Sequence, residues 1–195
     1  MRVIAGKHKG RRLRTVTDLS VRPATGRVKG SIFNILQSRV SWRDANVLDL
    51  FAGSGSLGIE AISRGARSVV FVENSKRAAS FLNENLAAMS ELDASEVVIG
   101  DAFDFLARPR TKYDVVFADP PYELEALKRL PTFIFRSGAV SKEGYLIIEH
   151  PEELVFEPSL LWEVAVERKY GRTVVTFFTH NSGTDNENSP VSGNV

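Results

Sequence analysis

Short apolar runs alternate with stretches of helical periodicity along most of this chain. Runs of four or five mainly apolar residues lie at 47–51, 68–72, 96–99, 114–118 and 145–149. Such runs favour buried strands of the parallel type. Helical patterns fill the intervals at 56–64, at 75–89, briefly after Asp101, and within 123–137. This alternation predicts a parallel sheet covered on both faces by helices, with right-handed crossovers.

Both ends of the chain depart from this pattern. Segments 161–168 and 173–179 are rich in β-forming residues and are joined by a turn at 169–172, which predicts an antiparallel hairpin. At the start, Val3, Ile4, Leu13 and Val16 resemble one face of a short β-hairpin that turns near Gly10. We therefore predict a seven-stranded, mostly parallel sheet with a C-terminal antiparallel hairpin and a small N-terminal β-hairpin extension.

One more helix is expected between the extension and the first strand. Thr25 is a suitable N-cap, and the apolar positions that follow at helical spacing are Val28, Ile32, Ile35 and Leu36. Gly26 and Gly30 lie inside this pattern, and an interior glycine costs about 1 kcal/mol relative to alanine. We expect this helix to depend on tertiary packing or on a ligand.

Composition excludes several classes of protein. The chain has 195 residues, 43% of them hydrophobic, which suits one domain with a substantial core. No apolar stretch approaches the roughly 18–20 residues that span a bilayer, and no secretory signal is visible, so we expect a cytoplasmic protein without membrane contact. Cysteine is absent, which excludes disulfides, thiolate metal sites and cysteine nucleophiles. Three scattered histidines predict no metal site.

Charge is distributed unevenly along the chain. Residues 1–30 carry nine basic residues and one acid, a local charge of +8, whereas the remainder carries −7. A basic arm on an acidic body is typical of a phosphate-binding extension, although a solvated leader is the alternative. We predict a basic RNA-binding extension at 1–24, a main domain at 25–180 and a disordered tail at 181–195, with His8 facing RNA or solvent. The residues expected to contact the nucleic acid are Lys7, Lys9, Arg11, Arg12, Arg22, Thr25 and Arg27.

The turn after the first strand carries a nucleotide-binding pattern. Gly53, Gly55 and Gly58 match G-x-G-x-x-G, and Glu73 ends the next strand, twenty positions after Gly53. This pattern permits binding of NAD, in which the acid would accept from ribose hydroxyls. Asp49 lies just ahead of the glycines, where a carboxylate would repel a pyrophosphate.

Two features, Asp49 and Asp101, favour S-adenosylmethionine over NAD. Asp49 can attract the methionine ammonium group, and Glu73 can accept from both ribose hydroxyls. Asp101 follows the third strand, where it could accept from the adenine amino group while the Ala102 N–H meets a ring nitrogen. Each acid has a plainer alternative as a helix N-cap or a solvated surface charge.

The tetrad Asp119-Pro120-Pro121-Tyr122 follows the fourth strand. Pro121 has no N–H and forces Pro120 into an extended conformation, which leaves the Pro120 carbonyl free. A carboxylate, a fixed carbonyl and an aromatic face suit a flat ring that bears an exocyclic amino group. If the strand order is 3-2-1-4-5, strands one and four are neighbours, and the tetrad faces the glycine loop across one crevice. That arrangement predicts methylation of a nucleobase amine, with a proline-rich turn around a buried acid as the alternative.

Three segments together resemble the bacterial RsmD family of guanine-N2 methyltransferases, which act on small-subunit ribosomal RNA. They are the leader 2–13 with 22–28, the loop segment 49–66, and the tetrad 119–122. The resemblance implies a Rossmann-like class I methyltransferase fold, S-adenosylmethionine as cofactor with S-adenosylhomocysteine as product, and 16S rRNA in a small-subunit assembly particle as partner of a monomeric enzyme. It places Asp119, Pro120 and Tyr122 at the target base. It places at the cofactor Asp49, Phe51, Gly53, Gly55, Glu73, Asp101 and Ala102.

The chain departs from the family at Gly26 and Gly30, where acidic residues are usual. Three other functions stay open on the residues alone. The tetrad would serve a DNA adenine-N6 methyltransferase equally well, although no target-recognition domain is visible. The glycine loop permits an NAD-dependent oxidoreductase, and the arm permits a non-catalytic RNA-binding protein.

Overall fold

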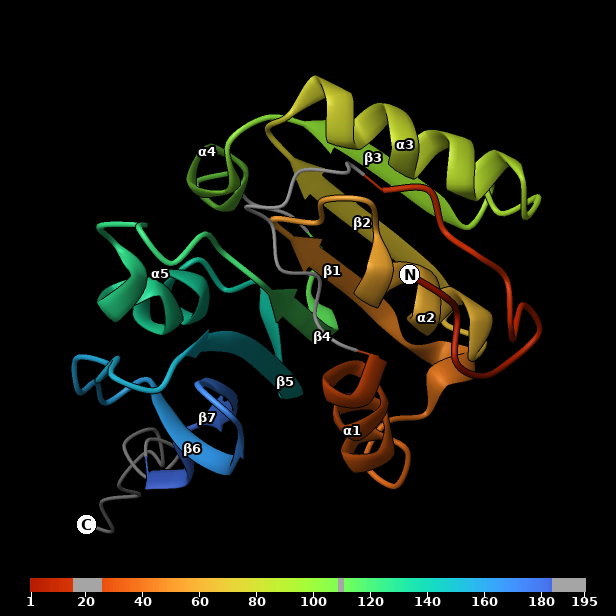
Figure 1. The fold of residues 1–195 in the computed structure, drawn as a ribbon. Coiled ribbons are helices and arrows are strands. Elements are labelled where there is room, and N and C mark those ends of the chain that lie inside the picture. Colours follow the sequence, from red (N-terminus) through yellow and green to blue (C-terminus); the bar gives the residue numbers. More distant parts are fainter. Residues whose placement is uncertain (16–25, 109–110, 184–195) are drawn as a thin grey trace, which may run out of the picture.

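A computed structural model describes residues 1–15, 26–108 and 111–183. Its centre is one seven-stranded sheet in the order β3-β2-β1-β4-β5-β7-β6 (Figure 1). The strands are β1 Asn46–Leu50, β2 Ser68–Glu73, β3 Ser95–Ile99, β4 Tyr113–Ala118, β5 Val140–Pro151, β6 Trp162–Tyr170 and β7 Thr173–His180. The first five strands pair in parallel, and β7 is antiparallel to both β5 and β6. The C-terminal hairpin is confirmed, and the order of the first five strands makes β1 and β4 neighbours.

Helices cover both faces of the sheet, as the alternation predicts (Figure 1). They are α1 Gly26–Leu36, α2 Ser56–Ser63, α3 Lys76–Ala87, α4 Ala102–Leu106 and α5 Leu130–Arg136, with 3-10 turns η1 Trp42–Asp44 and η2 Leu127–Arg129. Apolar residues of α1, α2 and α3 pack on one face of the sheet, and those of α4 and α5 pack on the other. The molecule therefore has three layers with an apolar core on each side of the sheet.

The boundary that the sequence pattern misplaces most clearly is the start of β5. The strand begins at Val140 rather than at 145, because Val140 pairs with Tyr113 ahead of a register shift. The intervening residues 141–143 are polar and do not form an apolar run. Pairing between strands, rather than local composition, sets this boundary.

Helix α1 exists despite its glycines because one face of it is buried. Val28, Ile32, Phe33 and Leu36 are at most 4% exposed, and the Phe33 ring packs against Trp42 and Phe117. The helix ends at Leu36, the last of the apolar positions that fall at helical spacing. The predicted N-cap, Thr25, lies outside the described residues, as does Arg22.

The N-terminal arm, residues 1–15, reverses direction as predicted. Arg2 and Arg12 form an antiparallel bridge, and the Gly10 N–H donates to the Val3 carbonyl at 2.9 Å. Val3 and Leu13 are buried in the same apolar cluster as α1 and α2. The arm is thus packed onto the body of the protein along α2 and α3 (Figure 1).

Candidate active site

The loops after β1 and β4 form the two sides of one crevice. Leu50 is in register with Ala118 on neighbouring parallel strands, so the residues that follow them emerge side by side at the carboxyl edge of the sheet. This edge is where open α/β sheets bind ligands. The charge of Asp119 helps to raise the pKa of Asp49, which reflects the proximity of the two carboxyl groups. The predicted juxtaposition of the glycine loop and the tetrad is confirmed.

Glycine is required in the loop for close packing. Gly55 has φ +83° and precedes α2, and a Cβ there would lie 2.3 Å from Leu82 Cδ1. A Cβ on Gly58 would lie 2.2 Å from the Phe71 ring. The absence of side chains thus lets α2 approach the sheet, and it brings the Gly58 N–H to 2.8 Å from Asp49 Oδ2, to which it donates.

Asp49 is a buried acid without a cation beside it among the described residues. It is 2% exposed, and burial raises its pKa to about 8. The hydrogen bond from Gly58 opposes this shift, whereas the charges of Asp119 and Glu73 add to it. A positively charged ligand group would relieve the cost of ionising this carboxyl.

Glu73 shapes the loop from the end of β2. Its Oε2 accepts from the Gly53 N–H and its Oε1 from the Ser75 N–H, both at 2.7 Å. Each carboxylate oxygen retains a further lone pair, so these bonds leave capacity to accept from ribose hydroxyls.

Asp101 has the plainer role that the sequence left open. Its Oδ1 caps α4 by accepting from the N–H groups of Phe103 and Asp104 at 2.7 and 3.2 Å. Both bonds use one oxygen of an exposed carboxyl, so Oδ2 remains available as an acceptor. Ala102 is buried beside it, at the first position of the helix.

Phe51 has an unusual backbone. Its φ is +58°, a left-handed conformation that is uncommon outside glycine and that concentrates at functional sites. No pattern in the sequence predicts this conformation. It turns the chain sharply between β1 and the glycine loop.

The tetrad has the features that its sequence predicts. Asp119 is partly buried, and desolvation raises its pKa to about 7. Pro120 is buried, and no backbone N–H of the described residues bonds to its carbonyl. Tyr122 is 39% exposed, and its hydroxyl lies 3.3 Å from Thr173 Oγ1 at the start of β7.

Glu149 is a candidate site residue that the sequence pattern did not single out. It lies on β5 immediately after Ile148, the partner of Ala118, and its side chain is 8% exposed. No described residue forms a hydrogen bond with its Oε2. The sequence does contain a feature that could have identified it, because Glu149 ends the apolar run at 145–149. Asp49, Glu73 and Asp119 stand in or next to the other apolar runs in the same way.

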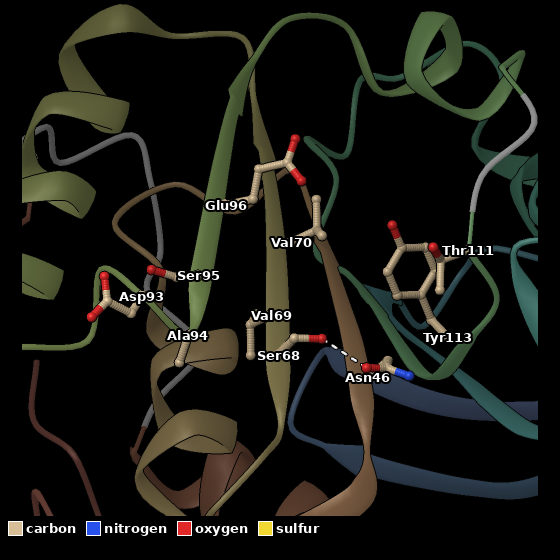
Figure 2. Close-up of a pocket in the computed structure, with 10 residues that line it drawn as sticks. All are labelled: Asn46, Ser68, Val69, Val70, Asp93, Ala94, Ser95, Glu96, Thr111 and Tyr113. Carbon is tan, nitrogen blue, oxygen red and sulfur yellow. Dashed lines mark hydrogen bonds between the residues drawn. The ribbon is translucent and has the colours of Figure 1, made fainter.

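The amino edge of the sheet carries a separate cleft of about 320 Å³ (Figure 2). It is lined by residues at or near the starts of four strands, including Asn46, Ser68, Ser95 and Tyr113. None of the predicted site residues lines it. The cleft lies at the opposite edge from the glycine loop and the tetrad.

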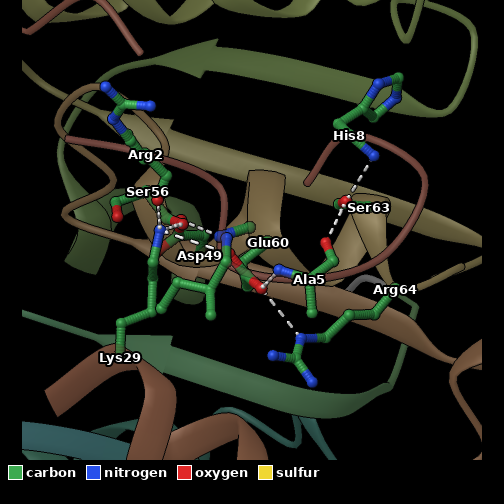
Figure 3. A network of polar contacts seen from close by, with 11 residues as sticks. Arg2, Ala5, His8, Lys29, Asp49, Ser56, Glu60, Ser63 and Arg64 are labelled. Carbon is green, nitrogen blue, oxygen red and sulfur yellow. Dashed lines mark hydrogen bonds and ion pairs between the residues drawn. The ribbon is translucent and has the colours of Figure 1, made fainter. Parts of the chain in front are cut away.

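A buried ionic network ties the arm to α2 (Figure 3). Glu60 is fully buried and accepts from the N–H groups of Ile4 and Ala5 at 2.7 and 2.9 Å. The Arg64 guanidinium and the Lys29 ammonium lie 3.0 and 3.4 Å from its carboxylate. Burial lowers the pKa of Lys29, and the charge of Glu60 partly opposes that shift.

The predicted RNA contacts of the arm differ in their surroundings. Lys7 pairs with Glu91 at 2.7 Å, and the Arg11 guanidinium donates to the Ala88 carbonyl. Lys9 and Arg12 are exposed, with no acidic partner among the described residues, and Arg27 is exposed on α1. The tip of the arm meets the C-terminal ends of α2 and α3, so Lys7 and Lys9 lie away from the crevice.

The expectation that His8 faces RNA or solvent was wrong. Its side chain is 17% exposed, and Nε2 lies 2.6 Å from Glu91 Oε1. Its backbone N–H donates to Ser63 Oγ at 3.0 Å. These two contacts fasten the tip of the arm to the body, because they reach α2 and the segment that follows α3.

Neither a metal site nor a membrane span is found in the described part of the chain. Residues 1–15, 26–108 and 111–183 include no group of three or more histidine or acidic side chains placed to hold a metal ion. No helix within these ranges is both long enough and apolar enough to cross a bilayer.

Comparison with known proteins places the chain in a family. The family model described as "Conserved hypothetical protein 95" matches residues 1–179. Ribosomal RNA small subunit methyltransferase D of Escherichia coli is 35% identical over 78% of this chain and 76% of its own, and that of Haemophilus influenzae is 32% identical over 88% and 89%. The solved structure of Escherichia coli yhhF is 30% identical, with a TM-score of 0.81 over 93% of this chain and 98% of its own. The chain therefore belongs to the RsmD family, whose model and named relatives span most of its length.

Proposed function

We propose that this protein transfers a methyl group from S-adenosylmethionine to the exocyclic N2 of a guanine in 16S rRNA. The observation that carries the proposal is the crevice, in which a buried acid behind a glycine loop adjoins a tetrad whose Pro120 carbonyl accepts from no backbone N–H of the described residues. Family membership supports rRNA methylation, because relatives are named for that activity on the small subunit.

The residues along β1, β2 and β3 fit the cofactor. S-adenosylmethionine supplies an electrophilic methyl group on a sulfonium when it is bound. Asp49 would hold the methionine ammonium, since it is a buried acid with no cation beside it among the described residues. Glu73 and the free oxygen of Asp101 would accept from the ribose hydroxyls and the adenine amino group, beside the Ala102 N–H.

The tetrad would hold the target amine. The lone pair of a guanine amino group is delocalised into the ring, which makes it a weak nucleophile. Asp119 and the Pro120 carbonyl would accept its two hydrogens, orient the nitrogen and stabilise the positive charge that develops on it as the C–N bond forms and the S–C bond breaks. The methylated nitrogen would then lose one proton to Asp119 or to water. Tyr122 would stack on the base, a contact worth about 1–3 kcal/mol in comparable sites. The base must be unpaired or flipped to enter.

The substrate is proposed to be a small-subunit assembly particle, with the enzyme acting as a cytoplasmic monomer. The arm residues and Arg27 would contact phosphates, which position an RNA without reading its sequence. Arg22 and Thr25 belong to the same proposal but lie outside the described residues.

The test is incubation with S-adenosylmethionine and undermethylated small-subunit particles, naked rRNA or DNA, followed by mass spectrometry of the nucleosides. The proposal predicts N2-methylguanosine from ribosomal RNA. N6-methyladenine in DNA would instead establish the adenine methyltransferase. A thermal shift with NAD but none with S-adenosylmethionine would favour an oxidoreductase.

Asp119→Ala tests the role of the tetrad. Loss of a preorganised acceptor predicts a fall in methyl transfer of about 10²-fold or more. Affinity for S-adenosylhomocysteine, measured by calorimetry, should change by less than about threefold, because Asp119 is assigned to the base and not to the cofactor. A threefold change corresponds to about 0.7 kcal/mol. Glu125→Ala, an exposed acid in the same loop, is the matched control. Full turnover by Asp119→Ala would remove this residue from the mechanism.

A further inference from the structure

The position of Glu149 places a second carboxyl group beside Asp119. Ile148 and Ala118 are in register on the parallel strands β5 and β4, so the next residues, Glu149 and Asp119, are neighbours across about 4.8 Å of strand spacing. Side chains alternate along β5, and His150 bonds to Thr176 on the α4/α5 face. Glu149 therefore points to the other face, where Asp49 also lies.

The Glu149 carboxyl lacks the partners that a buried acid normally has. It is 8% exposed, and Oε2 has no hydrogen-bond partner among the described residues. Buried acceptors are nearly always satisfied, and an orphan in a native fold calls for an explanation. Burial, followed by the charge of Asp119, raises the pKa of Glu149 to about 8, so this carboxyl ionises above that pH or when a hydrogen-bond donor faces it. A donor from a ligand in the crevice would complete this site.

Guanine carries such a donor next to its amino group. Its N1–H adjoins the carbon that bears N2, so both groups point from one edge of the ring. Two carboxyl groups side by side can accept from both. Adenine also carries an amine beside N1, but its N1 is an acceptor and would face a carboxylate unfavourably.

We propose that Glu149 accepts the N1–H of the target guanine while Asp119 and the Pro120 carbonyl hold N2, so that Glu149 determines the choice of guanine. This inference rests on the proposed function and deepens it. The tetrad alone grips any ring amine, whereas the added acceptor rejects a base whose N1 carries no hydrogen. A site built to pair a donor discriminates strongly against an analogue that lacks it, because a polar group of the site is then left unpaired.

The experiment changes the hydrogen-bonding groups on both sides of the proposed contact, at N1 of the base and at the side chain of Glu149. Once mass spectrometry has located the methylated nucleotide, substrates are prepared with guanine or with 2-aminopurine at that position. The analogue 2-aminopurine retains the N2 amine but has an unprotonated N1. At about pH 9, where a carboxyl with a pKa of about 8 is ionised, wild-type protein should favour guanine by about 100-fold in kcat/KM, as expected when a buried acceptor loses its donor. Glu149→Gln should slow guanine methylation by about 10- to 100-fold and raise the rate on 2-aminopurine, because the amide can donate to N1.

Controls separate this role from a structural one. Glu143→Gln, an exposed acid on the same strand, should keep the wild-type preference. Affinity for S-adenosylhomocysteine should be unchanged in Glu149→Gln, which verifies the fold of the variant. An unchanged preference in this folded variant would overturn the inference. Equal wild-type rates on guanine and 2-aminopurine would do so without any variant. Methylation of adenine instead of guanine by the wild type would reject the proposed function, and the inference with it.

Discussion

Asp49 lies where a negative charge is costly, yet its position just ahead of the glycine loop is the one that the sequence assigns to a cofactor contact. Burial raises its pKa to about 8, so in the ligand-free protein the carboxyl is largely protonated at neutral pH. A ligand ammonium needs the ionised form. Binding must therefore release a proton below that pKa, and the apparent affinity must depend on pH.

We predict that the affinity for S-adenosylhomocysteine rises about tenfold per pH unit from pH 6 towards 8 and then levels off, since one pKa unit is about 1.36 kcal/mol. Titration calorimetry at several pH values measures this dependence. Asp49→Asn should bind weakly with little pH dependence. Asp119→Asn should retain most of it, which separates Asp49 from the neighbouring acid whose pKa is also raised. A flat profile in the wild type would contradict the role of Asp49.

Single residues also show how far the sequence could predict the site. Asp49, Glu73 and Asp119 are predicted site residues because each adjoins an apolar run, and the fold brings Asp49 and Asp119 together as neighbouring strands require. Glu149 has the same signal, but its burial depends on the pairing of β5 with β4 and β7, which no local pattern specifies. His8 was misjudged because its partner, Glu91, is 83 positions away.

Among the secondary-structure elements, α1 and α2 contain glycines with opposite roles. Gly30 lies in the interior of α1, and a Cβ there would meet Ile4 Cδ1 at 3.8 Å, an ordinary contact. Gly58 lies in α2 against Phe71, where a Cβ has no room. Helix propensity favours alanine at both positions, so tertiary packing decides the sign of the effect.

Gly30→Ala should raise the free energy of unfolding by about 0.5–1 kcal/mol, because alanine gives up less conformational entropy in a helix. Gly58→Ala should lower it by about 1–3 kcal/mol through overpacking. Urea denaturation followed by circular dichroism measures both. Destabilisation by Gly30→Ala would contradict the expectation that helix propensity decides the effect at this position.

Helix α2 also holds the arm, which the sequence did not reveal. Glu60 looks like an ordinary helical acid, but its carboxylate binds two backbone N–H groups of the arm as well as Lys29 and Arg64. Removing one partner of a buried ionic group leaves a buried charge without compensation. The free energy lost in this way is larger than the net stabilisation that the intact pair contributes.

Glu60→Gln should therefore destabilise the protein by about 3–5 kcal/mol. Hydrogen exchange should accelerate at the amides of Ile4 and Ala5, which donate to this carboxylate. Glu84→Gln removes the exposed partner of Arg14 on α3 and should cost less than about 1 kcal/mol. Equal effects of the two substitutions would contradict the structural role of the network.

Over the whole molecule, the topology followed from local patterns, whereas the placement of the arm did not. Each strand and helix has its own periodicity, and handed crossovers leave few ways to assemble them. The arm depends instead on long-range bonds to Ser63 and Asn85, which composition cannot foresee. Basic charge predicted a phosphate-binding surface, but not that the tip would lie at the far ends of α2 and α3 from the crevice.

This separation predicts that the tip of the arm affects binding rather than chemistry. Lys9 and Arg12 are exposed with no acidic partner among the described residues, so they are available to phosphates. Lys9→Ala with Arg12→Ala should weaken RNA binding and reduce the slope of log affinity against log salt by about 0.7–0.9 for each phosphate that the variant no longer neutralises. Because the arm meets the body at the ends of α2 and α3 that lie away from the crevice, kcat at saturating RNA should be unchanged. Filter binding at several salt concentrations and single-turnover kinetics measure the two quantities.

Lys112→Ala with Arg136→Ala removes the same charge elsewhere on the surface and should leave the salt slope intact. An equal change in both double variants would mean that net charge alone, rather than the arm, attracts the RNA.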